Sequence, residues 1–193
     1  MNKEVYRILI AGEGGQGVQT MGHVLAQAAY DAGLHVAYMP NYGVEQRGGV
    51  SLAFIQLGTG VIGFPKFSTA DIIVNMRARA IERIDEYVGD ETLYIYDSDL
   101  ITGSELAHVA AEKLPIRATR KAAEKLSPKV ANMIMLGALT AELSVLKQKT
   151  LEDALETELA DKYVKKPQLR NFNKKALDMG TKMAKEAFQI QKT

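Results

Sequence analysis

A glycine-rich segment near the N-terminus is the first place where residue types and spacing could do chemistry. Gly12-Glu13-Gly14-Gly15-Gln16-Gly17 satisfies the pattern G-x-G-x-x-G through Gly12, Gly14 and Gly17. Glycines permit a tight turn and close approach of the backbone to a ligand, and free N–H groups at a helix N-terminus attract anions. The segment predicts an anion site if a strand precedes it and a helix follows it. The alternative is a turn that serves only helix–strand packing.

A nicotinamide dinucleotide is disfavoured as the ligand of this loop. Dinucleotide-binding units place an acid at the end of the second strand, where it holds the ribose hydroxyls. The expected second strand, Val36–Met39, is followed by Pro40-Asn41 and no acid. Asp31 comes too early and Glu45 lies beyond another turn. A nucleoside triphosphate loop is disfavoured as well, because no Lys-Ser or Lys-Thr follows the glycines.

A second loop, residues 41–49, carries the other candidate ligand-binding groups. It combines an aromatic ring, an acid, a cation and flexible backbone in Tyr42, Glu45, Arg47, Gly48 and Gly49. Loops at the carboxyl ends of parallel strands gather at one edge of the sheet, so we expect this loop to face the glycine loop. Arg47 can bind a carboxylate or phosphate through two hydrogen bonds. The alternative is a surface ion pair between Glu45 and Arg47, which stabilises little.

Two kinds of periodicity predict the elements that position these loops. Short apolar runs typical of buried strands occur at Val5–Ala11, Val36–Met39, Gly49–Leu57, Ala70–Asn75, Thr92–Tyr96 and Leu114–Arg117. Apolar residues at helical spacing predict helices at Met21–Ala29, which Gly33 ends, and at Ala78–Tyr87. Strands alternating with helices indicate an α/β fold, a doubly wound, mainly parallel sheet with helices on both faces.

The second half of the chain is expected to be mostly helical. Thr119 can cap a short helix, and Ser127-Pro128 can open another that runs to about Leu146 and is apolar nearly all round. Thr150–Asp153 resembles a capping box. A final helix places one apolar stripe at Leu169, Phe172, Ala176, Met179, Met183 and Ala187. We expect an α/β domain over residues 1–147 and a helical C-terminal extension, residues 148–193, packed on it.

Composition excludes several kinds of site. The chain has no cysteine, so it offers no disulfide, no thiolate zinc site and no cysteine ligand for an iron–sulfur cluster. The net charge of +1 favours neither nucleic acid nor a membrane as partner, and the longest apolar stretch, Val130–Leu139, is shorter than the 20 or so residues of a membrane span. We expect a cytoplasmic protein. His23, His35 and His108 are scattered without metal-ligand spacing, so neither a catalytic residue nor a metal ligand is predicted.

The two loops together resemble one protein family. Gly-x-Gly-Gly-Gln-Gly after the first strand, followed about 30 residues later by Tyr-Gly-x-Glu-x-Arg-Gly-Gly, is similar to the gamma domain of pyruvate and 2-oxoglutarate:ferredoxin oxidoreductases. Ala70-Asp71 before an apolar strand and the run Ala131–Ala138 fit the same family. The resemblance covers most of residues 5–145. The sequence departs from the family pattern at two places, which bear on the substrate assignment. Gly63–Lys66 stands where members often carry Ser-Pro, and Asn75–Arg77 stands where they often carry an acid.

The resemblance implies a subunit that works inside a larger enzyme. Members oxidatively decarboxylate a 2-oxoacid, pass the acyl group to coenzyme A and reduce ferredoxin with thiamine diphosphate, Mg²⁺ and iron–sulfur clusters. This chain has neither the Gly-Asp-Gly…Asn signature for thiamine diphosphate nor a cysteine. The implied cofactors therefore belong to partner alpha, beta and delta subunits. The chain alone would be inactive, and its two loops would border the site where coenzyme A acts as co-substrate.

Two alternatives remain open at this stage. The small subunit of indolepyruvate ferredoxin oxidoreductase shares the fold and a similar Gln-Arg-Gly-Gly string, and a nucleotide-binding regulatory module would share the glycine loop. The C-terminal segment also has a charge bias, with nine Lys or Arg from Lys162 onward against the two acids Asp178 and Glu186. We interpret it as the solvated face of an amphipathic helix. The alternative is contact with an acidic partner or with coenzyme A phosphates.

Overall fold

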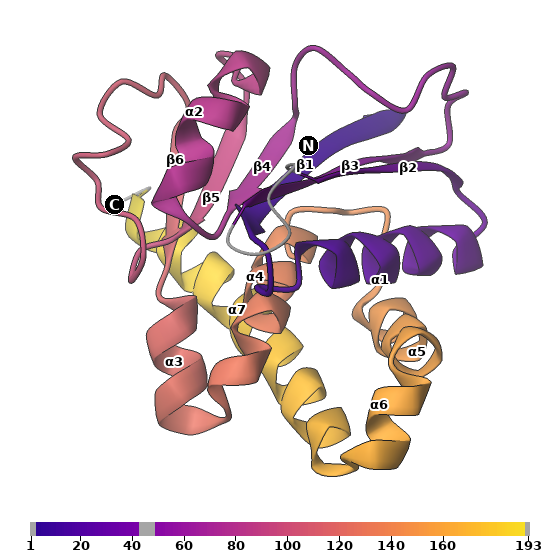
Figure 1. Ribbon diagram of the computed structural model, residues 1–193. Helices are drawn as coiled ribbons and strands as arrows, with labels where there is room; N and C mark the ends of the chain where they lie inside the picture. The colour runs from indigo at the N-terminus through magenta and orange to yellow at the C-terminus, as the bar shows by residue number, and fades with distance from the viewer. Residues whose placement is uncertain (1–2, 43–48, 192–193) are drawn as a thin grey trace.

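The computed structural model describes residues 3–42 and 49–191 and contains one mixed sheet with helices on both faces (Figure 1). Within those residues six strands lie in the order β2-β3-β1-β4-β5-β6. Their bounds are β1 Val5–Glu13, β2 His35–Tyr42, β3 Val50–Gly58, β4 Ile72–Asn75, β5 Leu93–Asp97 and β6 Glu112–Ile116. The expected α/β fold and all six expected strands are confirmed.

Strand direction explains which loops meet. β1, β4, β5 and β6 pair in parallel, whereas β3 pairs antiparallel with both β1 and β2. Residues 43–49 alone join β2 to β3, and a parallel crossover needs a dozen or more residues, so these two strands must form an antiparallel pair. β1 and β2 consequently run in the same direction on either side of β3. Their carboxyl ends lie at the same edge of the sheet.

Pro40 lies within β2, although the sequence predicted that it would end the strand. It pairs in register with Ala53 of β3. β2 is the edge strand, so a proline, which has no N–H to donate, costs the sheet little there.

The helices differ in length on the two faces of the sheet. They are α1 Val18–Asp31, α2 Ile81–Ile84, α3 Ala118–Lys125, α4 Ala131–Thr140, α5 Gln148–Glu158, α6 Ala160–Lys165 and α7 Gln168–Gln191, with the 3₁₀ turns η1 Ala78–Ala80, η2 Asp85–Tyr87 and η3 Pro128–Val130. α1, α4 and α7 cover one face, while α2 and its flanking turns cover the other (Figure 1). Successive residues of β1 alternate between the two hydrophobic clusters, as the two-residue period of a strand requires.

Several expected helix ends are wrong. The helix predicted over Ala78–Tyr87 is divided into η1, α2 and η2, and α4 ends at Thr140 instead of near Leu146. Thr119 and Thr150 are not caps, because each lies inside the first turn of its helix. The Thr119 hydroxyl instead donates a hydrogen bond to the carboxylate at the end of β5. Ser127 does cap η3, because its side chain accepts from the backbone of Lys129.

The helix predicted to be apolar all round is confirmed as part of the core. Residues 133–140 of α4 are buried between the sheet and α7. Glycines allow the α4 and α7 backbones to touch: a Cβ at Gly137 would collide with the backbone of Leu177, and one at Gly180 with that of Ile134. The predicted apolar stripe of α7 packs on the same hydrophobic cluster, as do buried residues of α5. None of the helices described is long and apolar enough to cross a bilayer.

Candidate functional site

The glycine loop and the second loop meet at the edge of the sheet. Glu13, the last residue of β1, pairs with Val50, while Tyr42, the last residue of β2, pairs with Ser51. The backbone N–H of Gly14 donates to the carbonyl oxygen of Gly49 at 3.0 Å. The expected proximity of the two loops is therefore confirmed for their described residues. Glu45, Arg47 and Gly48 lie outside the described residues, so the part assigned to them stays a prediction.

Two glycines give the first loop its shape. Gly15 and Gly17 have φ angles of 101° and 82°, in the left-handed region that favours glycine. Gly17 caps α1, and a Cβ there would collide with the side-chain amide of Asn132 on α4. Gly12 serves packing, because a Cβ at that position would lie 2.8 Å from Gln16 Oε1 and 3.0 Å from Val18 Cγ2. The loop thus needs glycine for both turn and close packing.

Gln16 fastens the loop to the sheet. Its Oε1 accepts from the backbone N–H of Glu13 at 2.7 Å, and its Nε2 donates to the carbonyl of Met76 at 3.1 Å. Both ends of the amide are therefore engaged by the protein. Gln16 lines the site, but the hydrogen bonds that it makes hold the backbone of the loop in place.

The N-terminus of α1 supplies free hydrogen-bond donors. The first helical bond runs from the N–H of Met21 to the carbonyl of Gly17, so the N–H groups of residues 18–20 have no partner in the helix. The first turn of the helix contains no acid, so the helix itself supplies no carboxylate to its positive end. A 14-residue helix with this terminus is suited to bind an anion.

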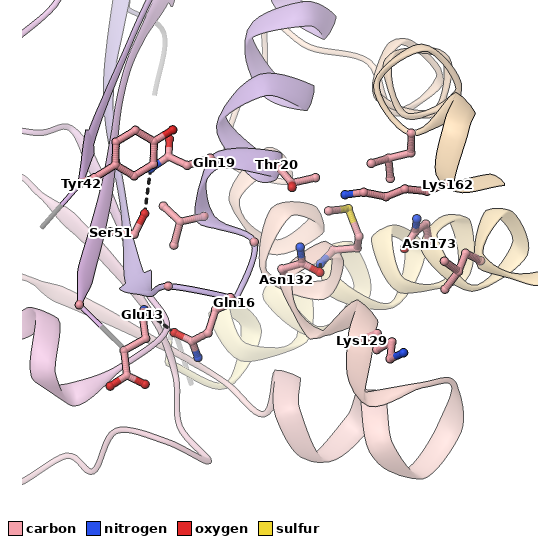
Figure 2. Close-up of a pocket in the computed structure, with 18 of the residues that line it drawn as sticks. Glu13, Gln16, Gln19, Thr20, Tyr42, Ser51, Lys129, Asn132, Lys162 and Asn173 are labelled. Atoms are coloured by element: carbon pink, nitrogen blue, oxygen red, sulfur yellow. Dashed lines mark hydrogen bonds between the residues drawn. The ribbon is translucent and has the colours of Figure 1, made fainter. Parts of the chain in front are cut away.

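This helix end opens into a cleft of about 680 Å³ (Figure 2). The glycine loop and the start of α1 form one wall, with Tyr42 and Gly49 beside them. The opposite wall comes from the start of α4 and from α6 and α7, through Lys129, Asn132, Met133, Leu159, Lys162, Tyr163, Leu169 and Asn173. Segments far apart in the sequence thus enclose one space.

The charges around the cleft favour an anion. Lys129 and Lys162 are exposed and make no ion pair with any described residue. Among the described lining residues the only acid is Glu13, and Arg77 Nε lies 3.0 Å from its Oε2. Figure 2 shows the Glu13 carboxylate directed away from Lys162 and Asn173. An anionic ligand would therefore meet two free cations and a helix N-terminus.

Neutral polar side chains on the cleft wall are held by one another. Gln19 Nε2 donates to Ser51 Oγ at 2.9 Å and to the Leu52 carbonyl at 2.8 Å, and its Oε1 accepts from the Tyr38 hydroxyl. Burial raises the pKa of Tyr38 to about 12, which keeps this phenol a donor at neutral pH. Across the cleft Asn173 Nδ2 donates to the Tyr163 hydroxyl at 2.9 Å. These bonds fix the wall before any ligand arrives.

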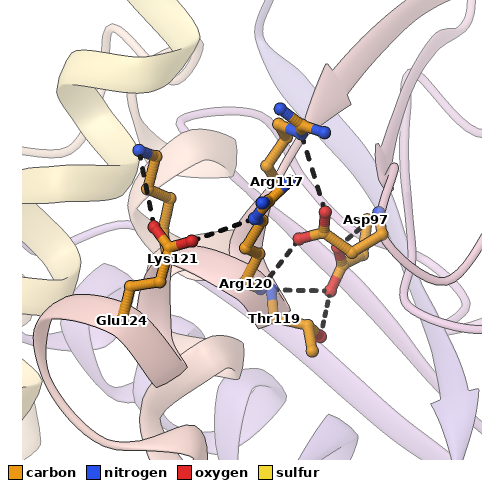
Figure 3. A network of polar contacts seen from close by, with 7 residues as sticks. Asp97, Arg117, Thr119, Arg120, Lys121 and Glu124 are labelled. Carbon is orange, nitrogen blue, oxygen red and sulfur yellow. Dashed lines mark hydrogen bonds and ion pairs between the residues drawn. The ribbon is translucent and has the colours of Figure 1, made fainter.

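A smaller hollow of about 220 Å³ lies on the other side of the glycine loop, beside Asp97. Asp97 is 2% exposed, and its carboxylate accepts from the backbone and hydroxyl of Thr119 and from the backbone of Asp99 (Figure 3). Burial raises the pKa of Asp97. Asp99 in turn accepts from the backbone N–H of Arg120 at 2.8 Å. The two acids hold the N-terminus of α3, a role that sequence reasoning missed.

The histidines take part in local contacts. His23 Nδ1 lies 3.6 Å from Glu158 Oε2, and its ring meets Tyr38 edge-on with the centroids 4.8 Å apart. His108 Nε2 lies 2.8 Å from Asp85 Oδ2. Among the residues that the structure describes, no group of three or more His, Cys, Asp or Glu could hold a metal ion.

Lys129 and Lys162 are site residues that sequence reasoning did not select. The signals were present: Lys129 follows the Ser127-Pro128 helix start, and Lys162 opens the basic C-terminal segment. Neither signal placed its residue beside the glycine loop, which lies more than a hundred residues earlier in the chain. Asn132 lies in the run that carried the family resemblance.

Comparison with known proteins shows the family of the chain. Residues 7–183 match the sequence model of a family described as pyruvate ferredoxin/flavodoxin oxidoreductase. The chain is 38% identical over 164 residues to 2-oxoglutarate synthase subunit KorC of Methanothermobacter marburgensis, covering 81% of this chain and 86% of that protein. It is 32% identical over 181 residues to ketoisovalerate oxidoreductase subunit VorA of Methanothermobacter thermautotrophicus, covering 93% of this chain but only 36% of that protein.

Two solved structures share the fold over nearly the whole chain. The gamma subunit of a keto/oxoacid ferredoxin oxidoreductase from Geobacter sulfurreducens superposes with a TM-score of 0.77 at 26% identity, covering 94% of this chain and 99% of that one. The 2-oxoglutarate:ferredoxin oxidoreductase from Magnetococcus marinus, solved with 2-oxoglutarate, coenzyme A and succinyl-CoA bound, superposes with a TM-score of 0.81 at 25% identity. The match covers 96% of this chain and 32% of that one. The chain therefore belongs to the pyruvate ferredoxin/flavodoxin oxidoreductase family, and it corresponds to the gamma subunit of that family's 2-oxoacid:ferredoxin oxidoreductases.

Proposed function

We propose that this gamma subunit works in a thiamine diphosphate-dependent complex that converts a 2-oxoacid and coenzyme A to acyl-CoA and CO₂ while reducing ferredoxin. Alpha, beta and, where present, delta subunits are its proposed partners. The redox cofactors do not fit this chain, since it has no cysteine for a cluster and its described residues form no metal site. Its own part is to border the active site and to bind a substrate there.

The substrate proposed for the cleft is coenzyme A. The observation that carries the proposal is the convergence of the α1 N-terminus, Lys129 and Lys162 on one space of about 680 Å³. Phosphate groups bind readily to helix N-termini and to lysine. The apolar side chains of Val18, Met133 and Leu159 line the same cleft and suit the uncharged arm of the molecule. The relative from Magnetococcus marinus was solved with coenzyme A bound.

The residues of this chain would bind and orient coenzyme A. Backbone N–H groups of residues 18–20 would donate to a phosphate, and the two lysines would balance its charge. Coenzyme A would thus be held with its thiol end directed toward the subunits that carry the other cofactors. Tyr42 and Gly49, which also line the cleft, support the same role for the second loop.

We propose 2-oxoglutarate as the 2-oxoacid, ahead of pyruvate. The support is the 38% identity to a 2-oxoglutarate synthase subunit that the chain matches over most of both lengths. The similarity to pyruvate synthase subunit PorC of Methanosarcina barkeri is 26% identity.

The test is a substrate comparison with the reconstituted complex. The subunits encoded with this chain would be produced together, purified and assayed for ferredoxin reduction with 2-oxoglutarate, pyruvate, 2-oxoisovalerate and indolepyruvate. The expected result is coenzyme A-dependent reduction with the highest kcat/KM for 2-oxoglutarate. A higher value for another 2-oxoacid would overturn the substrate assignment, and no activity with any of them would overturn the proposed function.

A further inference from the structure

A second hollow, separate from the cleft, lies between α3 and α7 and has a volume of about 510 Å³. Lysines stand on both of its sides: Lys121 and Lys125 come from α3, and Lys175 and Lys182 come from α7. It shares no lining residue with the cleft. We call it the α3–α7 groove.

Most of these lysines have no ion-pair partner among the residues that the structure describes. Lys125, Lys175 and Lys182 are exposed and make no ion pair with the described residues. Lys121 lies 4.0 Å from Glu124, which is closer to Arg120 at 2.9 Å. By contrast Lys174, next to the groove, has its own partner in Glu152 at 2.9 Å. The groove thus presents an excess of positive charge, with four lysines from two helices against Asp178 and Glu186.

The floor of the groove is apolar. Leu126, Met179 and Met183 line it and are only partly buried. Unbranched, polarisable methionines adapt to the shape of an incoming side chain. Apolar side chains between two rows of cations match an amphipathic partner, with apolar residues in the centre and acids at its edges.

Helical spacing gives the groove a direction and a length. Lys175, Met179, Lys182 and Glu186 recur at positions i, i+4, i+7 and i+11, so they follow one side of α7. Eleven residues at 1.5 Å each span about 16 Å, or three helical turns. A partner helix of about three turns would fill it.

A nucleic acid fits the groove less well than a protein segment. Asp178 and Glu186 line the same groove and can pair with basic side chains of a protein segment, which a phosphate backbone does not carry. The side-chain amide of Gln148 donates to Asp178, so that carboxylate is engaged within the protein. An apolar floor also has no counterpart on a phosphate backbone. A protein segment fits the charge and the floor together.

We propose that the α3–α7 groove docks an acidic amphipathic helix of another subunit of the same complex. This inference rests on the proposed function, because it takes the chain to work in a multi-subunit enzyme. It takes up the alternative that the sequence left open for the basic C-terminal segment, contact with an acidic partner, in place of the favoured solvated face.

Cross-linking of the purified complex tests the contact directly. A carbodiimide joins a lysine to a carboxylate only where the two form an ion pair, and mass spectrometry then identifies both residues. The expected result is a link from Lys125, Lys175 or Lys182 to an Asp or Glu of another subunit, together with slower acetylation of these lysines in the complex than in the isolated chain. Equal acetylation in both states and no link to another subunit would overturn the inference.

Charge reversal tests whether the groove contributes to assembly. The variant Lys125→Glu, Lys175→Glu, Lys182→Glu should be retained by tagged partner subunits about tenfold less tightly than wild type at low salt, because like charges then face each other. The control reverses three exposed lysines elsewhere, Lys147→Glu, Lys149→Glu and Lys166→Glu, and should assemble as wild type does. Thermal unfolding of the isolated variants shows that both are folded.

The outcomes separate this inference from the proposed function. If wild type itself fails to join the other subunits, the proposed function fails. If the groove variant assembles as tightly as wild type at every salt concentration, the docking inference fails and the proposed function stands. If a short RNA or DNA duplex binds wild type but not the groove variant, while both assemble equally, the groove is a nucleic-acid site and the inference fails.

Discussion

At the scale of single residues, Gly17 is a position that requires glycine for two reasons. Its φ of 82° disfavours any other residue, and a Cβ would displace the amide of Asn132. We predict that Gly17→Ala lowers the free energy of unfolding by roughly 1–3 kcal/mol through backbone strain. It should also raise the KM for coenzyme A in the complex, because the start of α1 and the Asn132 wall move apart. Urea unfolding and steady-state kinetics measure the two effects.

The glycine just after the end of α1 is a control that separates the effect of backbone strain from the effect of site geometry. Gly33, at the far end of α1, has a φ of 77° and open space around the position of a Cβ. Gly33→Ala should therefore lose stability and leave the KM for coenzyme A unchanged. If Gly17→Ala changes this KM no more than Gly33→Ala does, the glycine turn serves only packing.

Asp97 gives the stability of the fold a pH dependence of defined sign. Burial raises its pKa above the ordinary 3.8, so the folded protein holds this proton more tightly than the unfolded chain. The resulting stabilisation is fully present below pH 3.8 and is lost as the pH rises through the folded-state pKa. The free energy of unfolding of wild type minus that of Asp97→Asn should therefore fall as the pH rises over that range. A difference that is constant or rises with pH would contradict this account.

Residue types and spacing predicted which loops lie together better than which side chains line the cleft between them. The glycine loop and Tyr42 do line the cleft, as expected. Gln16 does so with both amide atoms engaged, by Glu13 and by Met76. A sequence pattern cannot show the contact with Met76, which lies 60 residues away. The same limit hid Lys162. The ligand-binding role of Arg47 stays a prediction from the sequence.

At the scale of elements, the α4–α7 crossing leaves no room for added volume. Gly180→Ala places a methyl group against the backbone of Ile134. Overpacking of this kind costs about 1–3 kcal/mol and outweighs the gain of about 1 kcal/mol in helix propensity. We therefore predict a net loss of stability in urea unfolding. Gly103→Ala, where a Cβ meets nothing within 4 Å, is the control and should stay within about 0.5 kcal/mol of wild type.

Helices and strands could be predicted from the sequence where the apolar periodicity is strong. They were mispredicted where the role of one side chain depends on its place in the fold. Apolar runs predicted all six strands. In β3, β4 and β5 every residue is buried, which leaves a continuous apolar pattern. The start of α3 was misread because Thr119 can cap a helix or bond to a distant acid, and Asp97 takes its hydroxyl. Pro40 was misread because its effect depends on whether its strand lies at the edge. Each error is a tertiary contact that overrides a local preference.

At the scale of the whole molecule, a net charge near zero conceals local charge. The chain carries +1 overall, yet free lysines gather at the cleft and along the α3–α7 groove. The composition predicted neither of these two surfaces, because a net charge says nothing of where the charged side chains lie. The positions of the charged side chains on the fold therefore indicate binding surfaces that the net charge does not.

The isolated chain is predicted to have no oxidoreductase activity. It has no cysteine to ligate a cluster, so the purified subunit should show no iron–sulfur absorbance in the visible range. Supplied with 2-oxoacid, coenzyme A and thiamine diphosphate, it should not reduce ferredoxin. Turnover by the chain alone, free of other subunits by mass spectrometry, would contradict its assignment as a supporting subunit.

The most direct test of the account is the KM for coenzyme A in complexes that carry Lys129→Gln or Lys162→Gln. Loss of one charge-assisted contact costs about 1.5–3 kcal/mol, or roughly tenfold or more in binding. Each variant should raise the KM for coenzyme A by about that factor and leave the KM for the 2-oxoacid unchanged, while Lys149→Gln, an exposed lysine on α5, should match wild type in both. If both cleft variants assemble fully and keep the wild-type KM for coenzyme A, the cleft is not its binding site.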